Sequence, residues 1–136
     1  MSSGPDVNWL LSSFSERTPG VSDAIVVSID GMLIAASSGL DRATADRIAA
    51  VASSLASITR GASRVFDGGS LRQVMVAYEN GYIVLSSLHD STVLAVMTAA
   101  GSDIGFIGHE MARIGMQIGG AMGPQLVESM RAQLPR

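Results

Sequence analysis

The sequence offers few side chains for catalysis, and their spacing matches no familiar active site. It contains two histidines, His89 and His109, no cysteine, and nine basic residues that are all arginine. These counts exclude disulfides, thiol nucleophiles, a Walker-type phosphate loop, a Schiff-base lysine and a three-histidine zinc site within this chain. His109-Glu110 begins like an H-E-x-x-H zinc helix, but Arg113 stands where the second histidine belongs, and no G-x-S-x-G elbow occurs. We therefore expect a protein that is not an enzyme, with no catalytic residue, cofactor or metal.

Glycines stand where a predicted strand gives way to a predicted helix: Gly101, Gly105 and Gly108. Backbone donors at a helix N-terminus can bind phosphate, but this spacing differs from the dinucleotide pattern G-x-G-x-x-G. An N-cap at Ser102 or Asp103, with glycines that permit close packing, explains the segment more simply.

The composition indicates a folded chain with more apolar surface than one domain needs. The 136 residues carry a formal net charge of −3, and 47% are hydrophobic while only 15% are charged. No stretch is long enough to span a membrane, and residues 1–9 do not resemble a signal peptide. The acidic balance and the scarcity of aromatic residues disfavour nucleic-acid binding. We expect one cytoplasmic domain over 1–136, with its core at about 7–122, that buries apolar surface in an oligomer.

Turn signals and periodicity define the elements that position these residues. Asp6 is a good N-cap for a first helix, while Asp30-Gly31 and Asn80-Gly81 are typical of hairpins with type I′ turns. Pro124 should kink or divide the last helix. The predicted elements are a helix from Val7, strands at 24–29 and 32–37, a helix at 42–64, strands at 71–79, 82–88 and 92–99, and a helix from Ile104 to about Gln133. Tight hairpins predict a five-stranded antiparallel sheet, with helices on both faces.

The middle helix combines two kinds of apolar row. A stripe of larger residues consists of Ile48, Val51, Leu55, Ile58 and Ala62. Beside it, small residues recur every four positions: Ala45, Ala49, Ser53, Ser57 and Gly61. A row with so little side-chain bulk lets another helix approach closely, and Gly115, Gly119 and Gly123 repeat this spacing in the last helix. We predict close helix packing at both rows.

Arg60 and Arg64 share one face near the end of the middle helix. Their charge complements the helix dipole, which alone accounts for them, while contact with an acidic partner is the functional alternative.

Three segments together resemble a known family. These are AIVVSIDGMLIAAS at 24–37, the small-residue helix at 45–60, and VMVAYENGYIVLSSLHDSTVLAVMTAAGSDIGFI at 74–107. From about Val7 to Gly120 the chain resembles the roadblock/dynein light chain family, and in detail its small free-standing actinobacterial members. The resemblance implies an α/β (α+β) roadblock/longin-like (profilin-like) sandwich, in the order helix, hairpin, helix, three-stranded meander, helix.

The resemblance also implies a function. Family members are typically homodimers, joined through their middle helices and third strands, that regulate, activate or scaffold Ras-like small GTPases. The implied partners are thus a second copy, a bacterial Ras-like GTPase and a sensor-kinase-like protein, with Arg60 and Arg64 as the candidate GTPase contact. The dimer interface predicted on this basis comprises Ala45, Ala49, Ala52, Ser53, Ala56, Ser57, Arg72, Val74 and Val76. The alternative is a small-ligand-sensing module of profilin-like fold, with Ser86, Ser87, His89 and the glycines at 101, 105 and 108 as candidate contacts.

Overall fold

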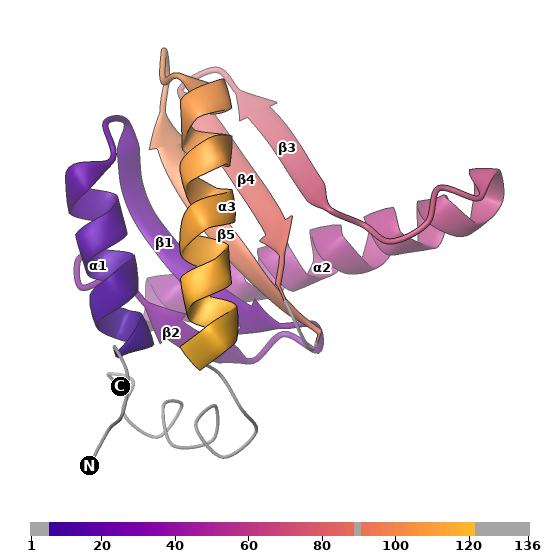
Figure 1. Cartoon of the computed structure of the whole chain (residues 1–136), viewed down its shortest axis with the longest axis horizontal. Helices are drawn as coiled ribbons and strands as arrows, with labels where there is room; N and C mark the ends of the chain where they lie inside the picture. Colours follow the sequence, from indigo (N-terminus) through magenta and orange to yellow (C-terminus); the bar gives the residue numbers. More distant parts are fainter. Residues whose placement is uncertain (1–5, 89–90, 122–136) are drawn as a thin grey trace.

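The protein folds into three layers around one antiparallel sheet. The computed structural model describes residues 6–88 and 91–121. Its elements are α1 (Val7–Arg17), β1 (Val21–Ser28), β2 (Leu33–Ala36), α2 (Arg42–Phe66), β3 (Gln73–Tyr78), β4 (Gly81–Ser87), β5 (Thr92–Ala99) and α3 (Ile104–Ala121). The strand order is β2-β1-β5-β4-β3, so β1 pairs with β5 and the two hairpins form one sheet. Helices α1 and α3 cover one face and α2 crosses the other (Figure 1), which confirms the predicted element order and the predicted five-stranded sheet.

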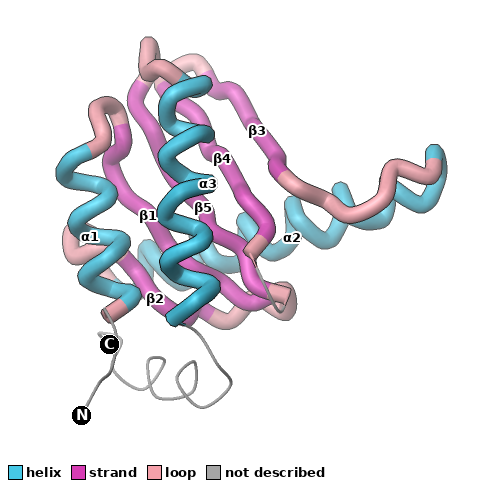
Figure 2. Tube along the Cα trace, in the orientation of Figure 1, coloured by secondary structure: helices cyan, strands magenta, loops and turns pink. Residues whose placement is uncertain are grey.

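The layer of α1 and α3 forms as the sequence predicts. The Asp6 carboxylate accepts a hydrogen bond from the Asn8 backbone N–H at 3.0 Å and caps the first turn of α1. The apolar positions of both helices are buried in one cluster against the sheet: Val7, Leu10, Leu11 and Phe14 from α1, and Ile107, Met111, Ile114 and Ile118 from α3. Figure 2 shows the two helices side by side on the same face of the sheet.

Helix α2 packs on the opposite face with its small residues inward. Ala45, Ala49, Ala52 and Ala56 are almost fully buried, in one cluster with the large side chains that the sheet presents on that face. Those side chains include Ile25, Val27, Leu33 and Leu85. Because the strands supply the bulk, alanine on the helix lets the two backbones come close. The first part of the small row, Ala45, Ala49 and Ser53, is thus buried, whereas Ser57 and the larger residues Val51 and Ile58 are exposed.

Both predicted hairpins are present, but neither turn is type I′. A type I′ turn needs positive φ at both central residues. At the first hairpin Gly31 has a φ of +94°, whereas Asp30 is not in the left-handed region. In the second, Tyr78 pairs with Gly81, so Glu79 and Asn80 form the turn, and neither has positive φ.

Gly81 is needed for a reason that the turn pattern did not indicate. A Cβ at this position would collide with the Thr98 carbonyl oxygen of the neighbouring strand β5. The glycine therefore permits the close approach of β4 to β5.

The glycines of α3 are placed differently from the prediction where the structure describes them. A Cβ at Gly115 would lie 3.2 Å from the Leu88 side chain after β4, so this glycine faces its own chain. Gly123, the predicted kink at Pro124 and the predicted helix end near Gln133 lie outside the described residues. Within the described chain, no helix is both long enough and apolar enough to span a membrane.

The C-terminal part of α2 extends beyond the sheet. The buried residues of α2 end at Ala56, while the helix continues to Phe66 and projects from the body (Figure 1). Asp67 follows as a C-cap with a φ of +60°, and the Gly68 backbone N–H donates to the Ser63 carbonyl at 2.9 Å. This projecting end carries two exposed apolar side chains, Val65 and Phe66.

Candidate protein-interaction surface

A stripe of exposed apolar residues follows the outer side of α2. Val51, Ile58 and Val65 are 45%, 72% and 87% exposed and are spaced by seven residues. Ser54 and Gly61 alternate with them at steps of three and four, so the row forms a continuous seam. We call Val51, Ser54, Ile58, Gly61 and Val65 the α2 seam. Large apolar side chains at this spacing on a helix surface are typical of a helix–helix contact.

The sheet has two edge strands, and their environments differ. The outward Ala36 N–H of β2 donates to the Asn8 side-chain carbonyl at 3.0 Å, so α1 covers part of this edge. The other edge is β3, which pairs only with β4 in the described chain. Its Met75 and Tyr78 side chains are half-exposed. An edge strand with unpaired backbone groups can accept a strand from another chain.

Five of the residues predicted for the dimer interface are buried in the single chain, and the interface itself stays a prediction. Ala45, Ala49, Ala52 and Ala56 are at most 1% exposed and Ser53 is 8% exposed. The four alanines pack in one cluster with strand residues of the same chain, so little of their surface is exposed. The physical reason is the bulk of the sheet residues, which the helix pattern alone does not report. Of the remaining predicted residues, Ser57 and Arg72 are exposed and Val74 and Val76 are half-buried.

The α2 seam overlaps only in part with the apolar stripe expected from the sequence. That stripe contains Val51 and Ile58 but not Val65. The seven-residue spacing of three large apolar side chains was visible in the sequence and could have indicated an external seam.

Arg60 and Arg64 lie near the projecting end of α2. Arg60 is half-buried and Arg64 is exposed. Neither has an ion pair in the described part of the chain, whereas Arg42 pairs with Asp46 at 3.0 Å. The two guanidinium groups are therefore free to meet acidic groups of a partner.

The residues considered for catalysis and phosphate binding are not brought together. His109 is exposed on α3, and Glu110 next to it pairs with Arg113 at 3.3 Å. At the start of α3, the Asp103 carboxylate accepts from the Phe106 backbone N–H at 3.1 Å, so the protein's own anion occupies the helix N-terminus near Gly101, Gly105 and Gly108. Among the described residues, no group of histidine and acidic side chains could hold a metal ion.

The polar residues of the ligand-sensing alternative are partly described. Ser86 and Ser87 are half-buried at the end of β4, and His89 lies outside the described residues. The Ser87 Oγ atom is buried without a hydrogen-bond partner in the described chain. A hollow of about 320 Å³ next to it is lined by Arg60, Ser70, Leu88 and Ser91 as well.

Comparisons with known proteins identify the fold. A Roadblock/LC7 domain from Streptomyces avermitilis has a TM-score of 0.75 and 35% identity, covering 95% of this chain and 98% of that one. A second Roadblock/LC7 domain from the same organism has a TM-score of 0.69 and 28% identity, with 82% and 97% covered. Myxococcus xanthus MglB has a TM-score of 0.76 over 84% of this chain and 92% of that chain, but is only 10% identical and supports the fold alone. No protein with curated functional information matches the sequence.

A comparison of the sequence with a family model gives the same family. The model of the Roadblock/LC7 domain matches residues 7–98, from the start of α1 to one residue before the end of β5. The matched segment contains all but the last residue of the sheet and both helices that precede β3, so it includes the α2 seam. The chain belongs to the Roadblock/LC7 family.

Proposed function

We propose that the protein is a homodimeric, non-catalytic regulator that binds a Ras-like small GTPase. The observation that carries the proposal is the exposed α2 seam, on a helix whose projecting end extends past the β3 edge of the sheet (Figure 1). Family membership supports the GTPase partner, because the resemblance described above implies regulation of Ras-like GTPases.

The seam has the size and chemistry of a contact between two copies. Val51 and Val65 are 14 residues apart, which corresponds to about 21 Å along a helix. Three bulky apolar side chains over this length would pack against the same three side chains on the α2 helix of a second copy, with the two copies related by a two-fold axis. Pairing of β3 with its counterpart would then join the two sheets, with Arg72, Val74 and Val76 near the junction.

The proposed GTPase contact is the pair Arg60 and Arg64 at the end of α2. Both are free of carboxylate partners in the described chain and stand beside the seam, so a dimer would present two such pairs. Arginine pairs of this kind recognise carboxylates through paired N–H donors. We propose that they attract an acidic patch on the GTPase and that the protein modulates its signalling, as an activator or a scaffold.

The test is binding and GTP turnover with the Ras-like GTPase encoded nearest to this gene. The GTPase is loaded with GDP or with a non-hydrolysable GTP analogue, and complex size is measured by light scattering. We expect a complex in one nucleotide state, and binding about tenfold weaker for the Arg60→Glu/Arg64→Glu double variant. Arg17→Glu, on the opposite layer, is the matched control. Absence of a complex in both nucleotide states would refute the proposal.

The ligand-sensing alternative has one observation in its favour, the unpartnered Ser87 Oγ beside Arg60. A guanidinium group and several hydroxyl groups would suit a small oxyanion. Melting of the protein with and without millimolar phosphate tests it. A rise in Tm that Ser87→Ala removes would support this function, and an unchanged Tm would exclude phosphate as the ligand.

A further inference from the structure

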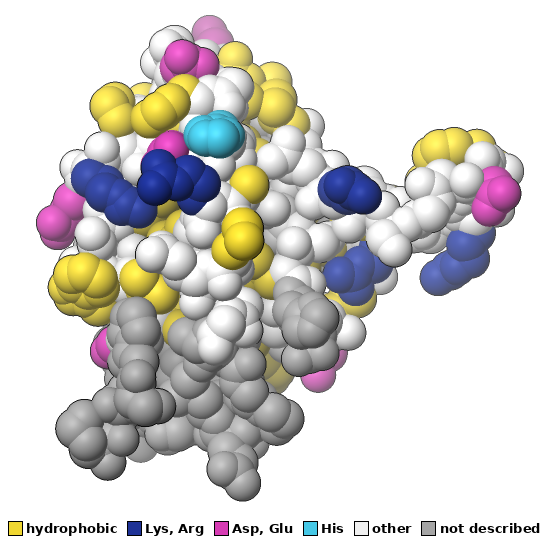
Figure 3. Space-filling model, in the orientation of Figure 1, with side chains coloured by type: hydrophobic (Ala, Val, Ile, Leu, Met, Phe, Trp, Pro, Cys, Tyr) yellow, Lys and Arg dark blue, Asp and Glu magenta, His cyan; other side chains and the backbone are white. Residues whose placement is uncertain are grey.

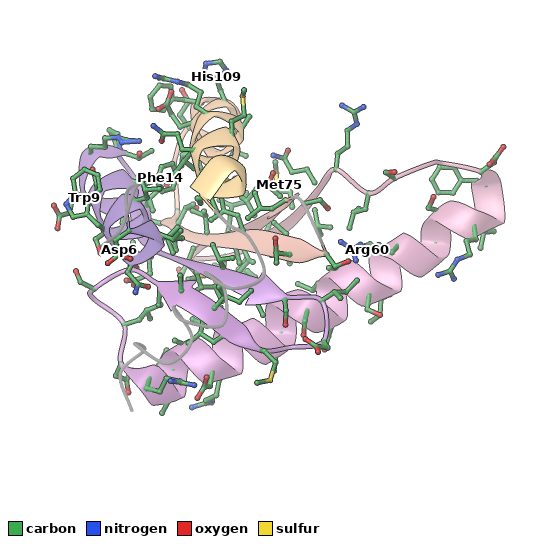
Figure 4. All side chains as sticks on the ribbon, turned by 60° about the horizontal axis from the view of Figure 1, so that its bottom comes forward. Asp6, Trp9, Phe14, Arg60, Met75 and His109 are labelled. Atoms are coloured by element: carbon green, nitrogen blue, oxygen red, sulfur yellow. The ribbon has the colours of Figure 1, made fainter. Side chains whose placement is uncertain are left out.

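A groove runs between α1 and α3 on the layer opposite to α2. It has a volume of about 620 Å³. Its principal lining residues are Trp9, Ser13, Arg17, Arg113, Met116 and Gln117. Figure 4 shows Trp9 on α1 and His109 on α3 on the same side of the sheet, with α2 and Arg60 on the other side. The groove is therefore separate from the α2 seam.

The apolar residues of this groove are unusually exposed. Trp9 is 62% exposed and Met116 is 80% exposed, although neither is needed to close the core below them. Exposed tryptophan and methionine side chains that face a hollow are common in surfaces that bind other proteins. The described chain leaves both largely uncovered.

The rim of the groove is basic. Arg17 lies 5.9 Å from the centre of the Phe14 ring and has no carboxylate partner in the described chain. Arg113 pairs with Glu110, yet 70% of its side chain stays exposed, and no carboxylate lines the groove among the described residues. Figure 3 shows basic and hydrophobic side chains mixed over this face. The groove thus places two basic side chains next to exposed apolar ones.

We propose that this groove binds an acidic amphipathic helix of a second protein. The hollow between two neighbouring helices is where a third helix packs, with its ridges in their grooves. Leucine-like side chains of the ligand would cover Trp9 and Met116, and its carboxylates would pair with Arg17 and Arg113. Because the groove and the α2 seam lie on opposite layers, this helix and a GTPase could be bound at the same time.

A peptide helix fits the observations better than an anionic lipid surface does. Side chains that enter a bilayer interface protrude from the protein, whereas Trp9 and Met116 line a hollow. Neighbouring α3 also contributes the polar side chain of Gln117, which can donate a hydrogen bond to a carboxylate of the bound helix.

The test uses the fluorescence of Trp9, which is the only tryptophan of the chain. The probe is a 16-residue acetylated and amidated helical peptide, with leucine at i, i+3, i+4 and i+7 spacing and glutamate on the flanking positions. We expect a saturable blue shift of the emission on titration of the full-length protein, and binding about tenfold weaker for Arg17→Glu/Arg113→Gln. Arg17→Lys/Arg113→Lys should keep most of the affinity because it keeps the charges.

Three controls decide the result. The same peptide with lysine for every glutamate should not bind, and Arg47→Glu on α2 should bind the acidic peptide like the wild type. Equal binding of both peptides, or no binding of the acidic one, would overturn the proposal. A shift with phosphatidylglycerol vesicles but not with the peptide would overturn it in favour of a membrane surface. Circular dichroism of each variant establishes that it is folded, and none of these outcomes depends on the GTPase.

Discussion

Replacement of Ile58 by glutamate is the sharpest test of the α2 seam. Ile58 is 72% exposed in the single chain and lies at the middle of the seam, between Val51 and Val65. In the proposed dimer its side chain would be covered by the partner helix. The substitution should therefore dissociate the dimer without unfolding the protomer.

The expected magnitude follows from the exposed fraction. Full burial of an isoleucine side chain contributes about 1.5–3 kcal/mol, so covering the exposed part yields about 1–2 kcal/mol per copy. Two copies give about 2–4 kcal/mol, and a loss near 3 kcal/mol weakens the dimer on the order of 100-fold. Two like charges facing each other across the axis add to this loss.

Sedimentation velocity at a series of micromolar concentrations measures the change directly. The wild type should sediment as a dimer, and Ile58→Glu should sediment as a monomer with an unchanged circular dichroism spectrum. Met116→Glu is the matched control, because Met116 is 80% exposed on the opposite layer. A folded Ile58→Glu variant that remains dimeric, or a monomeric wild type, would refute the placement of the interface.

Three further substitutions test the fold itself by thermal or urea denaturation. Ala49→Leu should destabilise by about 1–3 kcal/mol, because the fully buried Ala49 faces the sheet; a neutral result would mean that the small face of α2 is not packed there. Asp6→Ala should cost about 1 kcal/mol through loss of the α1 cap, and Asp6→Asn should restore most of it. Gly81→Ala should lower the Tm more than Gly120→Ala does, since an added Cβ at Gly81 collides with the Thr98 carbonyl oxygen whereas one at Gly120 meets no atom within 4 Å.

The sequence predicts the layer of α1 and α3 well, because each of these helices has one apolar face. In α1, Val7, Leu11 and Phe14 are the large apolar residues on the buried side, and a good capping residue precedes them. Whichever sheet they cover, that side must face inward. Local pattern and tertiary packing therefore agree.

Helix α2 is the case in which the pattern is insufficient. Both of its long rows are apolar or small, so either could face the sheet. The choice depends on the size of side chains on strands far away in the sequence, such as Ile25 and Leu85. The helix periodicity does not contain that information, and the larger row is in fact divided: Ile48 and Leu55 pack against the sheet cluster, whereas Val51 and Ile58 are exposed.

The turns and the strand order show the same limit. Asp-Gly and Asn-Gly indicate where the chain reverses but not which residues take positive φ, because strand register decides this. The pairing of β1 with β5 joins residues more than 60 positions apart, and no local signal reports it. The α1–α3 groove likewise depends on how two distant helices lie together.

The projection of α2 beyond the sheet has a consequence for local stability. Residues after Ala56 add about ten residues of helix that bury little against their own chain. Isolated helices of that length are marginal in water. The end of α2 should therefore open and close rapidly in a lone protomer and become ordered when a partner covers Ile58 and Val65. Association would then be coupled to folding of this segment, and its amide hydrogens should exchange more slowly as protein concentration rises.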